Sequence, residues 1–230
     1  MGERVSVRAV LFDLDGTLLD TLEDLADSAN AVLGESGFPT HPVEAYRYFV
    51  GDGARVLMTR VLPAASRDEA NITHCLRRFV AAYAERWNIK THPYPGIDAL
   101  LDGLDRRGIR KGVLSNKPHD ATVRCVRELL KGWEFDVVLG QQEGRPRKPA
   151  PEGALLIARE LGVHPGDVLY LGDTATDMQT AIAAGMIPVG ALWGFRTEDE
   201  LVASGARMLV GSPVEILAIL DARAEEGVGT

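Results

Sequence analysis

Two aspartates follow an apolar run near the start of the chain. Residues 9–12 read Ala-Val-Leu-Phe, Asp13 comes next, and Asp15 follows two positions later. A short apolar run bounded by Gly16 predicts a buried parallel strand. Because open α/β sheets hold their sites at the carboxyl ends of strands, we expect both aspartates at such an edge. A cation there could bind one side chain and the other residue's carbonyl, and a carboxylate can act as the nucleophile in phosphoryl transfer.

A second acidic pair follows another apolar run. Residues 169–172 read Leu-Tyr-Leu-Gly, Asp173 comes next, and Asp177 lies four positions later. If a helix begins just after Asp173, Asp177 lies one turn into it and near the strand end. Two more carboxylates beside Asp13 make an oxygen-rich pocket suited to Mg²⁺. The alternative is that Asp173 is an ordinary turn residue and that Asp177 only stabilises a helix N-terminus by interacting with the helix dipole.

A hydroxyl and a lysine lie between the two acidic pairs. Ser115 follows the apolar residues 112–114, and a hydroxyl at a strand end can donate to a phosphoryl oxygen. The alternative for Ser115 is an N-cap of the next helix. Lys148 precedes Pro149, where a lysine is ordinarily a solvated loop residue. Near bound phosphate, Lys148 would offset negative charge.

The expected charges predict a metal. Placing Asp13, Asp15, Asp173 and Asp177 together without a cation would cost on the order of several kcal/mol of repulsion in a partly buried site. Mg²⁺ and Lys148 would supply three positive charges against these four negative ones. A bound phosphate adds more negative charge, so further donors are needed. The backbone N–H groups of Leu14, Asp15 and Asn116 are candidates for that contribution.

The elements that must position these residues alternate along the chain. Strands are predicted near 8–13, 109–115, 135–139, 167–172, 187–192 and 206–210. Helices are predicted at 96–107, 119–130, 151–161, 176–184 and 213–221. Such alternation indicates βαβ units and a parallel sheet, which is an α/β fold. We expect the last residues, 225–230, to form a frayed tail.

Residues 21–90 have a different pattern. The segment is rich in Ala, Leu, Arg and Glu, and its periodicity predicts helices at 21–36, 42–50, 53–62 and 67–87 with no strong strand. The predicted layout is an α/β core of residues 1–20 and 91–224 with an all-α domain of residues 21–90. Arg55 follows a glycine-flanked loop in this domain and could bind a carboxylate or phosphate bidentately. The alternative is a solvated arginine at a helix start.

Composition excludes some classes of protein. The 230 residues carry a net charge of −8 with only 6% aromatic residues and no long basic block, which argues against a nucleic-acid surface. No apolar run approaches the length of a membrane span, and residues 1–8 lack the apolar region of a signal peptide. Cys75 and Cys125 show no metal-like spacing and are expected to be free thiols. We expect a cytoplasmic protein, monomeric or homodimeric, without a membrane partner.

Together these segments resemble the haloacid dehalogenase (HAD) superfamily. The matching features are Asp-Leu-Asp-Gly-Thr at 13–17, Ser115, Lys148 before proline, and the Gly-Asp-x-x-x-Asp spacing at 172–177. They occur in the family's order, and the resemblance covers about residues 7–220. It implies a Rossmann-like three-layer core with a helical cap inserted after the first motif. Most members are Mg²⁺-dependent phosphatases that work through an aspartyl-phosphate.

The resemblance also implies roles for individual residues. Asp13 would attack phosphorus, while Asp15 would protonate the leaving oxygen and then take a proton from water. The metal would be held by the Asp13 side chain, the Asp15 carbonyl and Asp173, with Asp177 a direct, water-mediated or indirect partner. The residues implied to bind substrate are Ser115, Asn116, Lys148 and, in the cap, Arg55.

Within this superfamily, the chain most resembles the subgroup of phosphoglycolate phosphatases. The shared segments are residues 50–55, 94–96, 115–118 and 193–196. The implied substrate is therefore 2-phosphoglycolate, which would be cleaved to glycolate and phosphate. The alternatives are a β-phosphoglucomutase-like phosphomutase, a pyrophosphatase or nucleotidase of the same superfamily, and a non-catalytic binding module on the same fold. The intact set of aspartates and lysine argues against the binding module.

Overall fold

The computed structural model describes the backbone of residues 7–228 and the side chains of residues 7–224. The chain forms two compact units. One contains the residues up to Leu18 and those from Pro93 onward, and the other is Leu19–His92. Among the described residues, no helix is both long and apolar enough to cross a lipid bilayer.

The first unit is built on a six-stranded parallel sheet with the order β5-β4-β1-β6-β7-β8. Its strands are β1 (Ala9–Phe12), β4 (Arg110–Pro118), β5 (Val137–Gln141), β6 (Val168–Gly172), β7 (Ile187–Ala191) and β8 (Met208–Val210). All six predicted strands are present. β1 and β6 are buried along their whole length, as expected for apolar strands covered on both faces.

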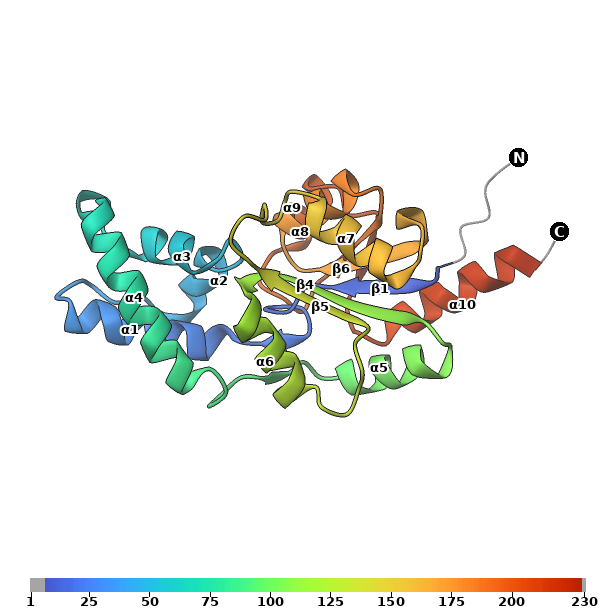
Figure 1. Cartoon of the computed structure of the whole chain (residues 1–230), viewed down its shortest axis with the longest axis horizontal. Coiled ribbons are helices and arrows are strands. Elements are labelled where there is room, and N and C mark those ends of the chain that lie inside the picture. The colour runs from blue at the N-terminus through green and yellow to red at the C-terminus, as the bar shows by residue number, and fades with distance from the viewer. Residues whose placement is uncertain (1–6, 229–230) are drawn as a thin grey trace. The chain divides into compact units, whose positions relative to one another are not determined.

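Helices cover both faces of this sheet. They are α5 (Ile97–Arg106), α6 (His119–Leu129), α7 (Glu152–Leu161), α8 (Ala175–Ala183), α9 (Glu198–Ala203) and α10 (Glu215–Val228). Figure 1 shows α7 and α8 on one face and α5 and α6 on the other, so the unit has three layers. The predicted α/β fold is therefore confirmed.

Two details of the first unit differ from the sequence prediction. Helix α10 continues through Val228, so the expected frayed tail is wrong for residues 225–228. Residues 225 and 226 are glutamates, which favour helix, and no proline interrupts residues 225–228. Residues 229–230 lie outside the described residues. The short helix α9 was not predicted, because six residues give little periodic signal.

The second unit is helical. Its helices are α1 (Leu22–Glu35), α2 (Tyr46–Phe49), α3 (Ala54–Val61) and α4 (Glu69–Arg86), and α1 packs against α4. Asp24 on α1 accepts hydrogen bonds from the backbone N–H groups of Lys90 and Thr91, at 3.0 and 2.8 Å, which ties the end of the unit to its first helix. Strands β2 (Leu19–Asp20) and β3 (His92–Pro93) form a two-stranded sheet, too short to be evident from sequence.

Candidate active site

The two acidic pairs meet because β1 and β6 are neighbours. Phe12 is in register with Leu171, and the Asp13 N–H continues the pairing by donating to the Leu171 carbonyl at 2.9 Å. The chain therefore leaves both parallel strands at the same edge, with Asp13 after β1 and Asp173 after β6. This is the edge that the sequence predicted for these aspartates.

Lys148 lies between two of the aspartates. Its Nζ is 2.8 Å from Asp13 Oδ1 and 2.7 Å from Asp177 Oδ1. Asp13 Oδ1 also accepts a hydrogen bond from the Leu14 N–H at 2.7 Å. All three charged side chains are buried. Burial raises the pKa of Asp13 well above its ordinary value and the charge of Asp177 raises it further, while Lys148 opposes the shift.

Asn116 fixes the backbone of Lys148. The Lys148 N–H donates to Asn116 Oδ1 at 2.9 Å, and Asn116 Nδ2 donates to the Lys148 carbonyl at 3.2 Å. A buried asparagine at the end of β4 thus holds the segment that carries the lysine. This pair of bonds gives Asn116 a positioning contact that the sequence did not reveal.

Asp177 faces the site and also helps to cap the N-terminus of helix α8 (Ala175–Ala183). Its Oδ2 accepts from the Thr174 N–H at 3.1 Å and from Thr174 Oγ1 at 2.6 Å, completing a capping box. The Tyr170 hydroxyl donates to Asp177 Oδ1 at 3.4 Å. A Cβ on Gly172 would lie only 2.3 Å from the Asp177 Cβ, so this close approach requires glycine. Both oxygens of Asp177 therefore already accept hydrogen bonds from the protein.

Asp173 is fully buried and held by residues from two other segments. Thr17 Oγ1 donates to its Oδ1 at 2.9 Å, and the Phe195 N–H donates to its Oδ2 at 2.8 Å. Burial and then the charge of Asp177 raise the pKa of Asp173 to about 7, although the bonds from Phe195 and Thr17 lower it.

Two glycines give Asp173 its space. A Cβ on Gly16 would lie 2.3 Å from Asp173 Oδ2, and Gly16 also has a φ of +88°, which disfavours other residues. A Cβ on Gly194 would lie 2.2 Å from the Asp173 Cβ and 2.5 Å from the Gly16 carbonyl oxygen. This packing could not be predicted from the segment 193–196, because it depends on a contact between distant parts of the chain.

The acidic cluster fits a hard divalent cation. Asp13, Asp173 and Asp177 each offer a carboxylate oxygen, and these three oxygens lie within 4.8 Å of one another. One lysine faces these three buried carboxylates, and burial raises the pKa of Asp13 and Asp173. An all-oxygen donor set with excess negative charge suits a cation such as Mg²⁺.

The Asp15 carboxylate lies outside this cluster and pairs with Lys117. Lys117 Nζ donates to Asp15 Oδ1 at 2.7 Å, and both side chains are largely buried. The Lys117 N–H donates to Ser115 Oγ at 3.1 Å, in the last part of β4, where the register with β5 is irregular. The strand therefore continues past Ser115, and Lys117 is a partner of Asp15 that the sequence did not reveal.

The family model of haloacid dehalogenase-like hydrolases matches residues 10–191, which include the four aspartates, Ser115 and Lys148. The chain belongs to this hydrolase family. The phosphoglycolate phosphatase of Pseudomonas putida is 33% identical over 96% of this chain and 82% of that protein. The N-acetylmuramic acid 6-phosphate phosphatase of Pseudomonas aeruginosa is 30% identical over 95% of this chain and 97% of that protein. A crystal structure from Lactobacillus delbrueckii subsp. bulgaricus matches with a TM-score of 0.89 and 32% identity, covering 94% of this chain and 98% of that chain.

Arg55 of this hydrolase belongs to the second unit. It lies at the start of α3 and forms an ion pair with Glu69 at the start of α4. Its side chain is half exposed, and the hydrogen bond from Arg55, followed by its charge, lowers the pKa of Glu69. Arg55 therefore has a carboxylate partner within its own unit, and its contact with substrate stays a prediction.

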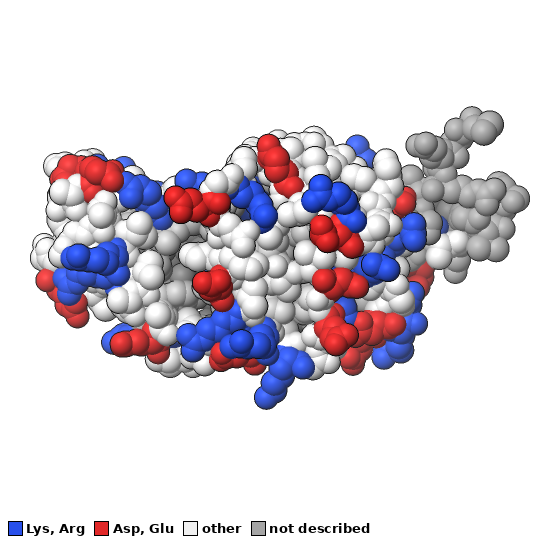
Figure 2. Space-filling view, viewed as in Figure 1, with Lys and Arg blue, Asp and Glu red and all other residues white. Residues whose placement is uncertain are grey.

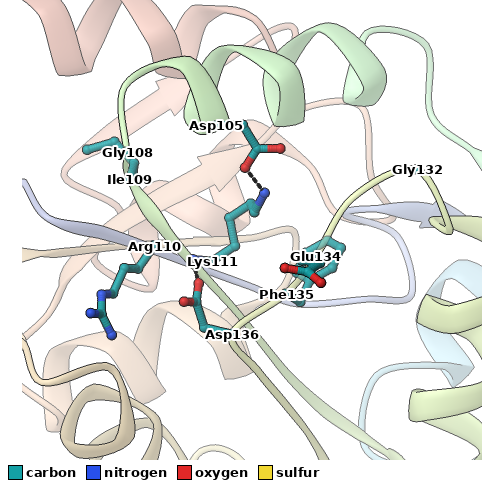
Figure 3. Close-up of a pocket in the computed structure, with 9 residues that line it drawn as sticks. All are labelled: Asp105, Gly108, Ile109, Arg110, Lys111, Gly132, Glu134, Phe135 and Asp136. Carbon is teal, nitrogen blue, oxygen red and sulfur yellow. Dashed lines mark hydrogen bonds and ion pairs between the residues drawn. The ribbon is translucent and has the colours of Figure 1, made fainter.

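A second group of charged residues lies at the opposite edge of the hydrolase's sheet. A cavity of about 720 Å³ opens where β4 and β5 begin, and Figure 3 shows Lys111 pointing there toward Asp105 at the end of α5. The Lys111 N–H donates to Asp136 Oδ2 at 2.8 Å. This cavity contains none of the predicted site residues.

Proposed function

We propose that this hydrolase is a Mg²⁺-dependent phosphatase of small phosphorylated metabolites that works through an aspartyl-phosphate on Asp13. The observation that carries the proposal is the convergence of three buried aspartates with one buried lysine at the carboxyl edge of the sheet. Family membership supports hydrolysis as the reaction. On the face in Figure 2, acidic and basic side chains are interspersed, which suits a small substrate better than nucleic acid.

Asp13 is the proposed nucleophile. Lys148 Nζ and the Leu14 N–H both contact its Oδ1 and so fix the orientation of the carboxylate. Attack forms a bond between an Asp13 oxygen and phosphorus as the bond from phosphorus to the leaving oxygen breaks. Asp15 gives a proton to that leaving oxygen and then takes one from the water that hydrolyses the aspartyl-phosphate.

The remaining site residues hold the phosphoryl group and the metal. We assign Ser115, Asn116 and Lys148 to the phosphoryl side, with Asn116 acting partly through the Lys148 backbone. A bound Mg²⁺ would neutralise the carboxylates and polarise the phosphoryl oxygens. The Asp13 and Asp173 side chains and the Asp15 carbonyl would hold it.

Asp177 is assigned an indirect role at the metal. Its Oδ1 is paired with the Lys148 ammonium group and its Oδ2 accepts from Thr174, whereas the bonds to Asp173 come only from the neutral Thr17 hydroxyl and the Phe195 N–H. Direct ligation of the metal by Asp177 would compete with the hydrogen bonds that cap helix α8 and with the one that positions Lys148. We therefore propose that Asp177 orients Lys148 and adds negative charge beside the metal.

The substrate proposed first is 2-phosphoglycolate. Relatives named phosphoglycolate phosphatase support it, and so does Arg55, whose guanidinium suits a second anionic group on the substrate. We propose residues 1–20 and 91–224 as the core and residues 21–90 as a cap that excludes water. A cytoplasmic monomer or homodimer is part of the same proposal.

A second candidate is a phosphatase for a different phosphomonoester. The relative named N-acetylmuramic acid 6-phosphate phosphatase matches over nearly the same length of chain. A phosphomutase, a pyrophosphatase and a nucleotidase would use the same core residues, so only substrate tests separate them.

Phosphate release from a substrate panel tests the proposal. The panel contains 2-phosphoglycolate, pyrophosphate, nucleoside monophosphates, hexose phosphates and N-acetylmuramic acid 6-phosphate, each with Mg²⁺ and with chelator. Asp13→Asn protein purified in parallel controls for contaminating phosphatases. We expect Mg²⁺-dependent release with a preference for 2-phosphoglycolate. Similar rates of phosphate release from several substrates would overturn the assignment of 2-phosphoglycolate but not the assignment as a phosphatase. No phosphate release from any substrate would overturn both assignments.

A further inference from the structure

Lys117 is one of three lysines buried in the described part of the chain. Lys148 faces the aspartate cluster, and Lys111 lies at the opposite edge of the sheet. Lys117 instead pairs with Asp15, with 2.7 Å between Nζ and Oδ1. The two side chains are only 5% and 13% exposed, so water contributes little to holding either charge.

The backbone of Lys117 is fixed on both sides. Its N–H donates to Ser115 Oγ at 3.1 Å, and its carbonyl accepts from Thr122 Oγ1 at 3.1 Å. Gly140 on β5 packs so closely that a Cβ there would lie 2.7 Å from the Lys117 carbonyl oxygen. The ammonium group is therefore presented from a rigid part of the sheet.

Asp15 needs such a partner because it lies beyond the end of β1, immediately before the turn of residues 16–18. Its carboxyl group has several rotamers, and a proton donor must stay within hydrogen-bond reach of the leaving oxygen. A buried ion pair is costly to desolvate and is weak evidence for a purely stabilising role. A role in positioning the Asp15 carboxyl group accounts for an ion pair between Lys117 and Asp15 at this edge of the sheet.

We propose that Lys117 is a positioning residue that holds the Asp15 carboxyl group in place for proton transfer to the leaving group. This inference rests on the proposed function, which supplies the role of Asp15. In the step concerned, the bond between phosphorus and the leaving oxygen breaks and its electron pair stays on that oxygen. For this step Asp15 is protonated on Oδ2 while its Oδ1 accepts from Lys117 Nζ, and the leaving oxygen takes that Oδ2 proton as Asp13 bonds to phosphorus.

The step predicts a dependence on the leaving group. The alkoxide of 2-phosphoglycolate needs a proton as it leaves, whereas the nitrophenolate of p-nitrophenyl phosphate departs without one. Single-turnover mixing with excess enzyme and Mg²⁺ measures leaving-group release before hydrolysis of the aspartyl-phosphate. The proteins compared are wild type, Lys117→Met, Lys117→Gln and Lys117→Arg. Lys111→Met is the control for removing a buried lysine elsewhere.

In Lys117→Met, we expect release from 2-phosphoglycolate to slow by about 10- to 100-fold more than release from p-nitrophenyl phosphate. Lys117→Gln should behave in the same way and covers the case in which the methionine variant does not fold. Lys117→Arg should recover most of the loss because it can restore the ion pair. Lys111→Met should match wild type with both substrates.

Equal slowing with the two substrates, or no slowing, would overturn the positioning role. A raised KM with an unchanged single-turnover rate would also overturn it, because Lys117 would then bind substrate directly. Absence of any leaving-group release by the wild-type enzyme would overturn the proposed function, and this inference with it.

Discussion

The two edges of the central sheet each hold a buried lysine beside carboxylates, yet they differ in charge and in access to water. At the carboxyl edge, Lys148 contacts Asp13 and Asp177, which are themselves buried. At the amino edge, Lys111 pairs with Asp105, whose side chain is 50% exposed. The ring of Phe135 lies 6.0 Å from Lys111 Nζ.

This difference separates a reactive site from a structural ion pair. Asp105 reaches water, so one lysine suffices to complete the pair at the amino edge. At the carboxyl edge three aspartates share one lysine away from water, and burial raises the pKa of Asp13 and Asp173. Such a site gains most from a further cation, which is why its chemistry should depend on metal.

The largest expected effect is at Asp13. Asp13→Asn should lower kcat by at least about 1000-fold because the nucleophile is lost, while the melting temperature stays near that of wild type. Steady-state phosphate release and thermal unfolding measure the two quantities. The matched control at the other edge is Asp105→Asn, which should keep full activity. An undeamidated Asp13→Asn protein that retains more than about a hundredth of the activity would contradict the assignment.

Substitutions of Lys148 and Lys111 should have the next largest difference in effect. Lys148→Met should lower kcat by about 100- to 1000-fold and destabilise the metal-free protein by about 3–5 kcal/mol, because the buried carboxylates lose their cation. Lys111→Met should leave kcat unchanged and cost less than about 1 kcal/mol, since Asp105 can turn to water. Denaturant unfolding with chelator present measures the stabilities. Equal changes in kcat and in unfolding free energy for the two substitutions would contradict the distinction between a reactive carboxyl edge and a structural amino edge.

Two glycines provide a smaller test of the same distinction. Gly194→Ala places a Cβ against Asp173, so the carboxylate must move and the affinity for Mg²⁺ should fall by about 10- to 100-fold. Gly132→Ala, in the lining of the amino-edge cavity, meets nothing within 4 Å and should change nothing. Activity titrated with Mg²⁺ gives both affinities. An unchanged Mg²⁺ titration in Gly194→Ala would contradict a role for Asp173 at the metal.

The smallest expected effect is on how the free energy of unfolding depends on pH. The pKa of Asp173 is raised to about 7 by burial and by Asp177, against an ordinary value of about 4 in the unfolded chain. Between these values the folded protein binds a proton that the unfolded chain has lost. The contribution of Asp173 to the free energy of unfolding of the metal-free protein is therefore full below about pH 4. It falls as the pH rises to about 7.

Metal binding reverses that trend because Mg²⁺ competes with the proton for Asp173. The rise in melting temperature on adding Mg²⁺ should therefore be larger at pH 8 than at pH 5.5. In Asp173→Asn the rise should be small at both pH values. A Mg²⁺-induced rise that is the same at pH 5.5 and pH 8 in the wild-type protein would contradict this linkage.

The sheet and its acidic edge could be predicted from the sequence because their signals are local. Apolar runs followed directly by Asp13 and Asp173 predict strands and place the aspartates at the strand ends. Parallel neighbours then bring those ends together, and the order β4-β1-β6 does so here.

Other features depend on contacts between distant segments and could not be predicted. Lys117 pairs with Asp15 across 102 positions, and the space beside Asp173 depends on Gly194, which only the folded chain brings near. Helix α9 and strands β2 and β3 are too short for periodicity to detect.

Identifying the phosphorylated residue tests the proposed chemistry most directly. Wild-type enzyme mixed with 2-phosphoglycolate and Mg²⁺ is quenched in acid and reduced with borohydride, which converts an acyl phosphate to an alcohol. Peptide mass spectrometry then locates the product. We predict homoserine at position 13, dependent on substrate and absent with chelator. Phosphate release accompanied by reduction at another residue, or at none, would contradict a covalent role for Asp13.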